Sequence, residues 1–243
     1  MDLKAKIFNI QKFSLHDGRG IRTSVFFSYC NLKCKWCSNP DCNLNKNTEY
    51  DIPTLMQEVL KDKAFYEKSG GGVTLTGGEI FMQYDFIKEF CIALKKAGLH
   101  IAIETSAVVE LEKFKNIVEL VDYVFVDCKH YDNQMHKQGT GVGNGLVIDN
   151  IKWLTTSGKK YLVRIPVIPN FNDKVEDAQG FCDLLNELGV SKVELLPFHQ
   201  LGSNKYKLHN IKYEYEGVRQ LYKEDLIEYK NIFKQNNIEV IVK

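Results

Sequence analysis

The chain has 243 residues and a mass of 28.0 kDa, and 44% of its residues are hydrophobic, 12% aromatic and 26% charged. This composition is that of a globular protein with a sizeable core, and it excludes a disordered or collagen-like chain. Lys and Arg number 32 against 31 Asp and Glu, a formal charge of +1, so no overall basic field favours nucleic acid or an anionic membrane. No apolar run reaches the roughly 20 residues that span a bilayer, and the first residues lack a signal-peptide pattern. We therefore expect a cytoplasmic protein with no nucleic-acid or membrane partner.

Short β-rich runs alternate with longer amphipathic stretches, and no linker or low-complexity segment interrupts them. The pattern predicts a single domain over residues 1–243. Its βα alternation predicts an α/β fold with parallel strands and right-handed crossovers, as a doubly wound sheet or a barrel-like one. The expected strands are Thr23–Tyr29, Gly72–Thr76, His100–Thr105, Tyr123–Lys129, Tyr161–Pro166 and Lys192–Pro197, with a seventh at Glu239–Val242. The expected helices are Pro53–Lys68, Tyr84–Ala97, Leu111–Val121, Asn144–Thr156, Val175–Leu188 and Arg219–Asn236.

Residues capable of chemistry gather near the carboxyl ends of the expected strands. In barrels and open α/β sheets alike, ligands bind beyond these ends. The pattern therefore predicts one site, built from six strands. The candidate residues are Cys30, Gly77, Gly78, Glu79, Glu104, Thr105, Asp127, Lys129, Arg164 and His199.

The seven cysteines are the most informative part of the composition. Three of them, Cys30, Cys34 and Cys37, form a C-x3-C-x2-C loop directly after the first expected strand, and in a reducing compartment a disulfide framework is excluded. Thiolates suit zinc or an iron–sulfur cluster. Structural zinc normally takes four ligands, whereas three cysteines leave one coordination position open for chemistry. A structural zinc site completed by His16 or Cys42 is the alternative.

The cysteine triad, with Trp36 before its last cysteine and Asn39 two residues after it, resembles the cluster motif of radical S-adenosylmethionine (SAM) enzymes. Six further segments resemble the activating enzymes of glycyl radical enzymes, most closely those that serve pyruvate formate-lyase. The resemblance extends from about Ile7 to Tyr206, and it implies a partial (β/α)6 TIM-like barrel of the radical SAM type in a single domain. The segments are DGRGIRTSVFF, SGGGVTLTGGE, ETS, VDCKHYD, VRIPVIPNFND and LPFHQLGSNKY.

The resemblance also implies the cofactors and their ligands. Cys30, Cys34 and Cys37, in the loop 30–37, would hold one [4Fe-4S] cluster, with the amino and carboxylate groups of SAM on its fourth iron. The residues implied to contact SAM are Trp36, Ser38, Gly77, Gly78, Glu79, Asp127, Lys129, Arg164 and His199.

Particular roles follow from the same resemblance. Trp36 would lie over the adenine, and Glu79 near the methionine ammonium. Lys129 and Arg164 would lie near the carboxylate, and His199 would contact adenosine. An arginine inside a buried strand is costly unless it is paired, so the sequence independently predicts a partner for Arg164.

Two further sites are implied. Glu104, Thr105 and Asp127 match a monovalent-cation site, although Glu104 stands where the family has Asp. Asp17 and Gly18 lie in a segment that helps to grip the glycine loop of the partner protein.

The implied activity is reductive cleavage of SAM to a 5′-deoxyadenosyl radical, which abstracts a hydrogen atom from a backbone glycine of a glycyl radical enzyme. The chain holds no second cluster motif, so a flavodoxin or ferredoxin would supply the electron, and we expect a monomer. Between Pro40 and Pro53 there is no room for the ferredoxin-like insert of many relatives, which favours pyruvate formate-lyase as the target. Arg19 and Tyr29 replace a Pro and a Gly of the family, so recognition of the target is expected to differ.

Three alternatives stay open at this stage. The protein is an activating enzyme for another glycyl radical lyase or decarboxylase, or a radical SAM enzyme that acts on a small molecule or on a ribonucleotide reductase subunit. From a different class, it is a non-catalytic iron–sulfur or zinc-binding protein. That last reading predicts four metal ligands and no cofactor pocket.

Overall fold

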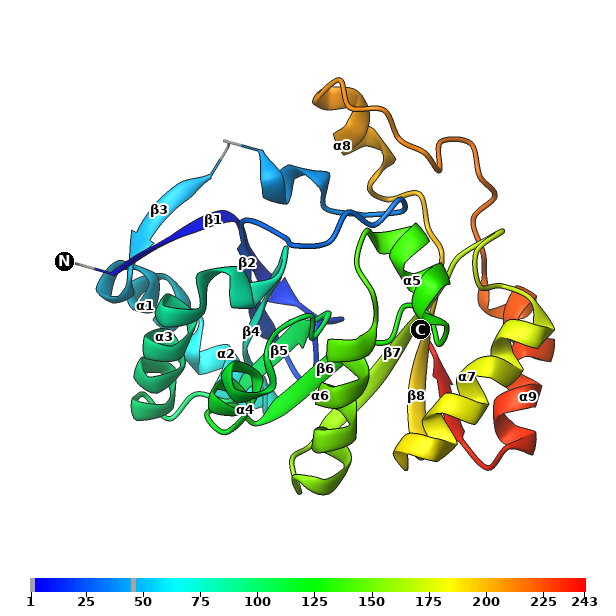
Figure 1. The fold of residues 1–243 in the computed structure, drawn as a ribbon. Coiled ribbons are helices and arrows are strands. Elements are labelled where there is room, and N and C mark those ends of the chain that lie inside the picture. Colours follow the sequence, from blue (N-terminus) through cyan, green and yellow to red (C-terminus); the bar gives the residue numbers. More distant parts are fainter. Residues whose placement is uncertain (1–2, 45–46) are drawn as a thin grey trace. The chain divides into compact units, whose positions relative to one another are not determined.

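The computed structural model describes residues 3–44 and 47–243, which divide into two compact units (Figure 1). The first unit contains the described parts of residues 1–31, 41–105 and 109–125, and the second contains residues 32–40, 106–108 and 126–243. One strand, β6 (Tyr123–Asp127), has its first three residues in the first unit and its last two in the second.

The first unit is a sheet with helices packed along it. Its strand order is β3-β1-β2-β4-β5-β6, in which β1 pairs antiparallel with β2 and β3, whereas β2, β4 and β5 are parallel. In Figure 1 the helices α1 to α4 lie together on one side of these strands. The elements are β1 (Lys4–Ser14), β2 (Arg22–Phe27), β3 (Thr48–Asp51), α1 (Ile52–Leu60), α2 (Lys63–Ser69), β4 (Gly72–Gly77), the 3-10 turn η2 (Ile80–Gln83), α3 (Tyr84–Lys96), β5 (Ile101–Thr105) and α4 (Leu111–Val118), and the turn η1 (Pro40–Asn43) begins at the boundary.

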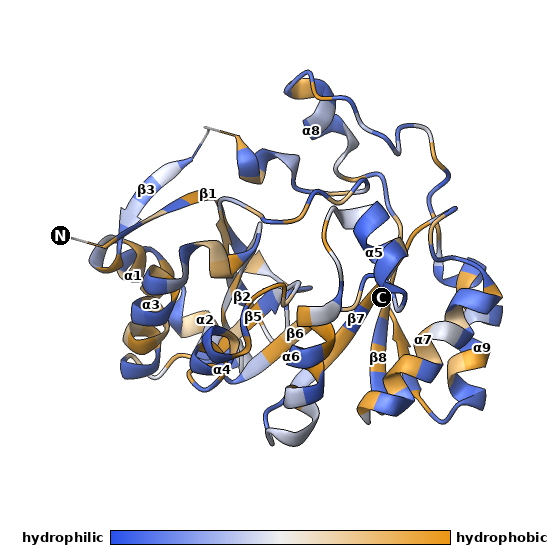
Figure 2. Cartoon of the chain, in the orientation of Figure 1, coloured by the Kyte–Doolittle hydropathy of each residue, from blue (hydrophilic) through white to orange (hydrophobic). Residues whose placement is uncertain are grey.

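The second unit continues the βα alternation. Its strand order is β6-β7-β8-β9, with β7, β8 and β9 parallel. Its strands are mostly apolar, whereas α7 carries polar and apolar residues on different faces (Figure 2). The elements are α5 (Asn133–Thr140), α6 (Gly145–Thr156), β7 (Tyr161–Val167), α7 (Val175–Leu188), β8 (Lys192–Pro197), α8 (Ser203–Leu208), η3 (Lys223–Leu226), α9 (Ile227–Gln235) and β9 (Glu239–Val242).

The predicted α/β class is confirmed. All seven expected strands are present within two residues of their predicted ends, and β2, β4 and β5, like β7, β8 and β9, are parallel as expected. Among the described residues, no helix is long and apolar enough to cross a bilayer.

The helix expected over Pro53–Lys68 is two helices, and a tertiary contact explains the break. Asp62 lies between α1 and α2 and is buried, and its carboxylate accepts a hydrogen bond of 2.8 Å from the Thr23 hydroxyl on β2. The Tyr66 hydroxyl then donates to the carbonyl of Val59 at 2.9 Å, in the last turn of α1, where the Asp62 amide also donates to it at 3.3 Å. A polar side chain bonded across the core therefore overrides the helical periodicity.

Two strands and two α-helices of the described chain were not expected from the sequence: β1, β3, α5 and α8. The eight residues of α5 include few apolar side chains, and both ends of the helix are capped. The Asp132 carboxylate accepts from the Met135 amide at 2.8 Å, and Gly141 ends the helix at φ 88°. The helix expected over Arg219–Asn236 begins eight residues later, at Ile227, after the turn η3.

A close backbone approach joins the start of β4 to the segment before β2. A Cβ atom on Gly71 would lie 1.9 Å from the carbonyl oxygen of Ile21, and one on Gly20 would lie 2.5 Å from the amide nitrogen of Gly71. These are backbone atoms that a side-chain rotation cannot move. Only glycine therefore allows β2 and β4 to begin in register at Arg22 and Gly72.

We predict that Gly71→Ala lowers the free energy of unfolding by about 2 kcal/mol or more, because the new methyl group meets fixed backbone. Urea unfolding measures the loss. Gly145→Ala is the matched control, since a Cβ at the start of α6 meets nothing within 4 Å and Gly145 has no positive φ. Equal stability of the two variants would contradict the close approach.

Candidate functional site

Cys30 lies three residues beyond the end of β2, in a backbone held by the segment that follows it in the sequence. Its amide donates to the Asn43 side chain at 3.0 Å, and the amide of Tyr29 donates to the carbonyl of Cys42 at 2.8 Å. Tyr29 has φ 75°, in the left-handed region that favours glycine. Tyr29 therefore adopts a backbone conformation that costs a non-glycine residue about 1 kcal/mol.

The two glycines at the end of β4, Gly77 and Gly78, pack against this same turn. A Cβ on Gly78 would lie 2.0 Å from the Tyr29 carbonyl oxygen, and one on Gly77, at φ 119°, would lie 2.4 Å from the Phe27 amide nitrogen. The amides of Gly78 and Glu79 donate to the carbonyls of Phe27 and Tyr29 at 2.9 and 2.8 Å. In the first unit, the glycines therefore let β4 hold the backbone that leads into Cys30.

The carboxylates of Glu79 and Glu104, predicted at the ends of β4 and β5, accept hydrogen bonds from other residues of the first unit. Glu79 is 1% exposed, and its carboxylate accepts from the Thr105 hydroxyl at 2.8 Å and from the Phe81 amide at 3.3 Å. Glu104 accepts from the Thr76 hydroxyl at 2.8 Å. Glu79 and Thr105 are thus brought together, as neighbours from the ends of β4 and β5.

Asp17 and Gly18 lie at the other end of the strands of the first unit. The Asp17 carboxylate accepts from the hydroxyls of Ser14 and Ser24, both at 2.5 Å, and its carbonyl accepts from Thr74 at 2.7 Å. Gly18 packs on the side chain of Arg22, the first residue of β2. This segment thus lies at the amino ends of β2 and β4, whereas Cys30 follows the carboxyl end of β2.

In the second unit, the cysteine loop is seated by Trp36. The indole is 7% exposed and packs with Ile168, Phe198 and Phe171, with a ring-centroid distance of 4.7 Å to Phe171. Cys34 is partly buried against the same cluster. The position of Trp36 before the last cysteine was noted from the sequence, but its burial among side chains that follow β7 and β8 was not.

Helix α5 holds the backbone of the loop from one side. The amides of Lys33 and Lys35 donate to the carbonyls of Thr140 and Gly139 at 2.7 and 3.1 Å. These carbonyls belong to the last turn of α5, where intrahelical partners are missing. A Cβ on Gly139 would lie 3.0 Å from the Trp36 ring and 2.6 Å from that of Phe171, so this glycine makes room for the seat.

Helix α8 holds the other end of the loop. The Tyr206 hydroxyl donates to the Cys37 carbonyl at 2.9 Å, and the Lys205 ammonium donates to the Asn39 side chain at 2.9 Å. Gly202 approaches Ser38 so closely that a Cβ would lie 2.8 Å from the Ser38 Cα. Sequence reasoning missed these roles, although all three residues lie in the LGSNKY segment that carries the resemblance.

The second unit contains two short ion pairs at predicted site residues, one at the end of β6 and one that joins β7 to β8. Lys129 Nζ donates to Asp127 Oδ2 at 2.7 Å, so the prediction that the two share a face agrees with the structure. Arg164 is 5% exposed, and its Nε donates to Glu194 Oε2 at 2.7 Å, its cross-strand partner on β8. The buried arginine thus has the partner that its burial requires.

Asn172 joins these elements. It is fully buried, its amide group donates to the carbonyls of Lys129 and Pro166 at 3.1 and 2.9 Å, and its side-chain oxygen accepts from the Ile168 amide at 2.7 Å. Only an asparagine or glutamine side chain both donates twice and accepts. The RIPVIPNFND segment therefore fixes the position of the Lys129 backbone through Asn172, a role that its sequence did not reveal.

His199 follows β8 and is half-buried, and burial lowers the pKa of its imidazole. Its Nδ1 accepts from the Leu201 amide at 3.3 Å, which places the remaining proton of the neutral ring on Nε2. At neutral pH the ring is therefore an uncharged donor.

Exposure to solvent distinguishes the three cysteines of the motif from the other four. Cys30, Cys34 and Cys37 are partly exposed, whereas the other four are buried. Burial raises the pKa of the Cys91 and Cys128 thiols to about 12. In the described residues, no group of three or more His, Cys, Asp or Glu side chains converges as a ready metal site. The accessible thiols of the motif are the donors that suit an iron–sulfur cluster.

The family model of the radical SAM superfamily matches residues 24–182 of this chain. The chain belongs to the radical SAM superfamily. Membership implies a [4Fe-4S] cluster and SAM, and the match includes the cysteine loop, the TGGE turn and the ends of β5, β6 and β7. The predicted [4Fe-4S] cluster and SAM, and the predicted partial-barrel fold, are thereby confirmed.

Curated relatives of this radical SAM protein are activating enzymes of glycyl radical enzymes. The 4-hydroxyphenylacetate decarboxylase activating enzyme of Clostridioides difficile (strain CD196) is 32% identical, with 99% of this chain and 96% of the relative aligned. The pyruvate formate-lyase-activating enzyme of Clostridium pasteurianum is 35% identical over 90% of this chain and 92% of the relative. A crystal structure of a domain of pyruvate-formate lyase-activating enzyme from Bacteroides vulgatus shares the fold, with a TM-score of 0.59 and 20% identity over 71% of this chain and 99% of that one.

We predict that iodoacetamide at about pH 8 alkylates Cys30, Cys34 and Cys37 of the cluster-free protein well before Cys91 and Cys128. The reason is that only the thiolate reacts, and thiols with a pKa of about 12 are protonated at this pH. Peptide mass spectrometry after short exposures measures the order. Labelling of Cys128 as fast as Cys34 would contradict it.

We also predict that Tyr206→Phe lowers the free energy of unfolding by about 1 kcal/mol and speeds the loss of iron from the reconstituted protein, because the Cys37 carbonyl loses its donor. Urea unfolding and the kinetics of iron release measure the two effects. Tyr222→Phe is the control, since that side chain is 56% exposed. Unchanged iron release in the Tyr206 variant would show that this bond does not support the loop.

Proposed function

We propose that this protein activates pyruvate formate-lyase by generating a glycyl radical on it. The choice of pyruvate formate-lyase as the target rests on the lengths of the alignments with the curated relatives. The alignment with the decarboxylase activating enzyme spans 305 positions, which exceeds the 243 residues of this chain by 62. The alignment with the pyruvate formate-lyase-activating enzyme spans 221 positions and covers 90% of this chain, so it needs few gaps.

The relatives that act on other enzymes thus carry extra residues that this chain lacks. The alignments with activating enzymes for (2S)-3-sulfopropanediol dehydratase and choline trimethylamine-lyase span 304 and 290 positions. A longer chain of that kind has room for further cluster motifs, whereas this one has a single cysteine triad. Its short form supports a one-cluster activating enzyme of the pyruvate formate-lyase type.

Cys30, Cys34 and Cys37 would hold the cluster. When bound, the cluster and SAM supply the one-electron cleavage that yields the hydrogen-abstracting radical. The protein contributes a rigid loop, through the Trp36 seat and the backbone bonds to α5 and α8, so that the thiolates keep their positions when the cluster changes charge.

The remaining predicted contacts would orient SAM. Asp127 and Lys129 carry opposite charges within 2.7 Å of each other, which suits a zwitterionic methionine group and a ribose. Arg164 is already paired with Glu194, so it would act on the carboxylate region as one member of that pair. His199 offers an uncharged donor, which suits adenosine. Ser38, Trp36 and the Gly77, Gly78 and Glu79 turn complete the proposed set.

The proposal includes a monovalent cation at Glu104, Thr105 and Asp127. Within the first unit, the Thr105 hydroxyl donates to Glu79, and Glu104 accepts from Thr76. A cation would therefore compete with these bonds. Likewise, Asp17 and Gly18 would reach a partner's glycine loop only from the amino ends of the strands, where Asp17 is bonded to two serines.

A second target is favoured by a separate observation. The alignment with the C. difficile relative covers 99% of this chain, more than the 90% covered by the pyruvate formate-lyase-activating enzyme. A decarboxylase is therefore the competing protein substrate, and the experiment below includes it.

We predict that the reconstituted, reduced protein with SAM produces a glycyl radical EPR signal on pyruvate formate-lyase, and at most a tenth of that signal on 4-hydroxyphenylacetate decarboxylase. Cys34→Ala should abolish both the radical and the formation of 5′-deoxyadenosine, because a cluster ligand is lost. Cys182→Ala, a buried cysteine of α7, is the matched control and should retain activity. A stronger signal on the decarboxylase would overturn the proposed target, and activity in the Cys34 variant would overturn the ligand assignment.

A further inference from the structure

His130 follows Lys129 just beyond the end of β6, and its imidazole is 1% exposed. Its Nδ1 accepts a hydrogen bond of 3.0 Å from the Asp132 amide, so the proton of the neutral ring is on Nε2. Among the residues that the structure describes, this Nε2 has no hydrogen-bond partner. Burial also lowers the pKa of the ring, which keeps it neutral. The fold thus holds a buried, unpaired donor that no part of the candidate site uses.

The imidazole of His130 lies among aromatic rings. Its centroid is 4.5 Å from that of Tyr131 and 5.9 Å from that of Phe181, and it meets Phe171 edge to face at 5.0 Å and 72°. Aromatic faces accept N–H groups only weakly, so a phenylalanine would fill this place without the cost of an unpaired donor. Packing alone therefore does not account for a histidine here, and the acceptor at Nδ1 does.

The hydrogen bond to Nδ1 fixes the entry to α5. Asp132, whose amide donates it, is the N-cap of that helix. The Asn144 side chain donates to the His130 carbonyl at 3.1 Å and so holds the same turn from the start of α6. At the other end of α5, carbonyls of the last turn accept from the amides of Lys33 and Lys35. Through α5, the acceptor of His130 thus supports the backbone of the cysteine loop.

The ring of His130 supports the same loop by a second route. Phe171, which the imidazole contacts, packs against Trp36 with a centroid distance of 4.7 Å. Trp36 lies between Cys34 and Cys37 in the sequence, and Cys34 packs on the same cluster. A phenylalanine would supply only the ring and an asparagine only the acceptor, whereas a histidine supplies both.

We propose that His130 is a positioning residue that fixes the cysteine loop relative to Lys129. Lys129 is its neighbour in the chain, and Cys34, Cys37 and Lys129 belong to one compact unit. A SAM molecule held both by a cluster on the loop and by Lys129 requires a defined distance between the two. His130 sets this distance through Trp36 on one side and through α5 on the other. The inference rests on the proposed contact between Lys129 and SAM, and it is independent of the target enzyme.

Two variants separate the contributions of the imidazole. His130→Asn keeps an acceptor for the amide two residues ahead but removes the ring, so the fluorescence of Trp36 should shift to longer wavelength, while hydrogen exchange of the Lys33 and Lys35 amides stays slow. His130→Phe keeps the ring but removes the acceptor, so this exchange should become about tenfold faster with unchanged fluorescence. Both are measured on cluster-free protein with Trp153→Phe, which leaves Trp36 as its single tryptophan.

The affinity for SAM is measured by isothermal titration calorimetry on the reconstituted, oxidised protein. Each His130 variant should raise the Kd for SAM about fivefold to tenfold, and Lys129→Gln should raise it at least as much. Ile87→Val removes one methyl group from the buried face of α3 in the first unit. It is the matched control for a general loss of stability, and it should leave both the SAM affinity and the Trp36 fluorescence unchanged.

The outcomes distinguish this inference from the contact on which it rests. Unchanged affinity in Lys129→Gln would defeat the proposed SAM contact. Weak binding in that variant with normal binding in both His130 variants would overturn the positioning role, as would equal losses in Ile87→Val. Phe171→Leu interrupts the route to Trp36 without touching the hydrogen bond of His130, and it decides the matter if the His130 variants do not fold. It should shift the fluorescence and weaken SAM binding, and normal binding would overturn the inference.

Discussion

The seating of Trp36 is the interaction on which the rest of the candidate site depends. A buried indole of this kind is worth about 3–5 kcal/mol when replaced by alanine, far more than any single hydrogen bond of the loop. It lies between Cys34 and Cys37, so the anchor and the predicted cluster ligands share one short segment. The loop is thus held by its tryptophan and by hydrogen bonds of its backbone.

The elements around this anchor also provide hydrogen bonds to the loop. The buried backbone amides and carbonyls of the loop need hydrogen-bond partners, and the last turn of α5 and the Tyr206 hydroxyl supply them. The open carbonyls of α5 exist because every helix ends with unsatisfied groups. The last turn of α5 therefore supplies the loop with acceptors, Thr140 and Gly139, that receive the amides of Lys33 and Lys35.

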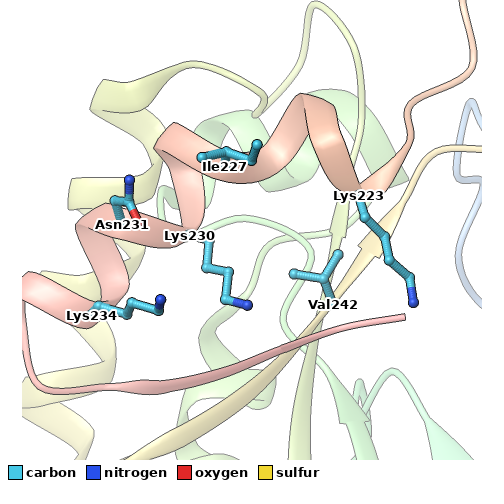
Figure 3. A pocket seen from close by; sticks show the side chains of 6 residues that line it. All are labelled: Lys223, Ile227, Lys230, Asn231, Lys234 and Val242. Carbon is cyan, nitrogen blue, oxygen red and sulfur yellow. The ribbon is translucent and has the colours of Figure 1, made fainter.

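Buried charge follows the same logic. Arg164 and Glu194 pair across β7 and β8, where the removal of two charges from water is offset only by good geometry. Such a pair adds little stability compared with an apolar pair, but it holds charge at a defined place in a dry interior. The pocket between α9 and β9 is the opposite case, because Lys223 and Lys234 in its lining are exposed and their charges stay in water (Figure 3).

The sequence by itself determined the α/β class, the positions of seven strands and the family, and it predicted the cysteine ligands, because hydrophobic periodicity and a three-cysteine spacing are local properties of the chain. It also predicted that Arg164 needs a partner, since burial of a guanidinium is costly wherever it occurs. Only the tertiary structure decided that the partner is Glu194, that Asp62 divides the first helix, that Gly77 and Gly78 pack on the turn before Cys30, and that α5 and α8 hold the cysteine loop. Each of these depends on contacts between residues far apart in the chain, whose energies no local pattern records.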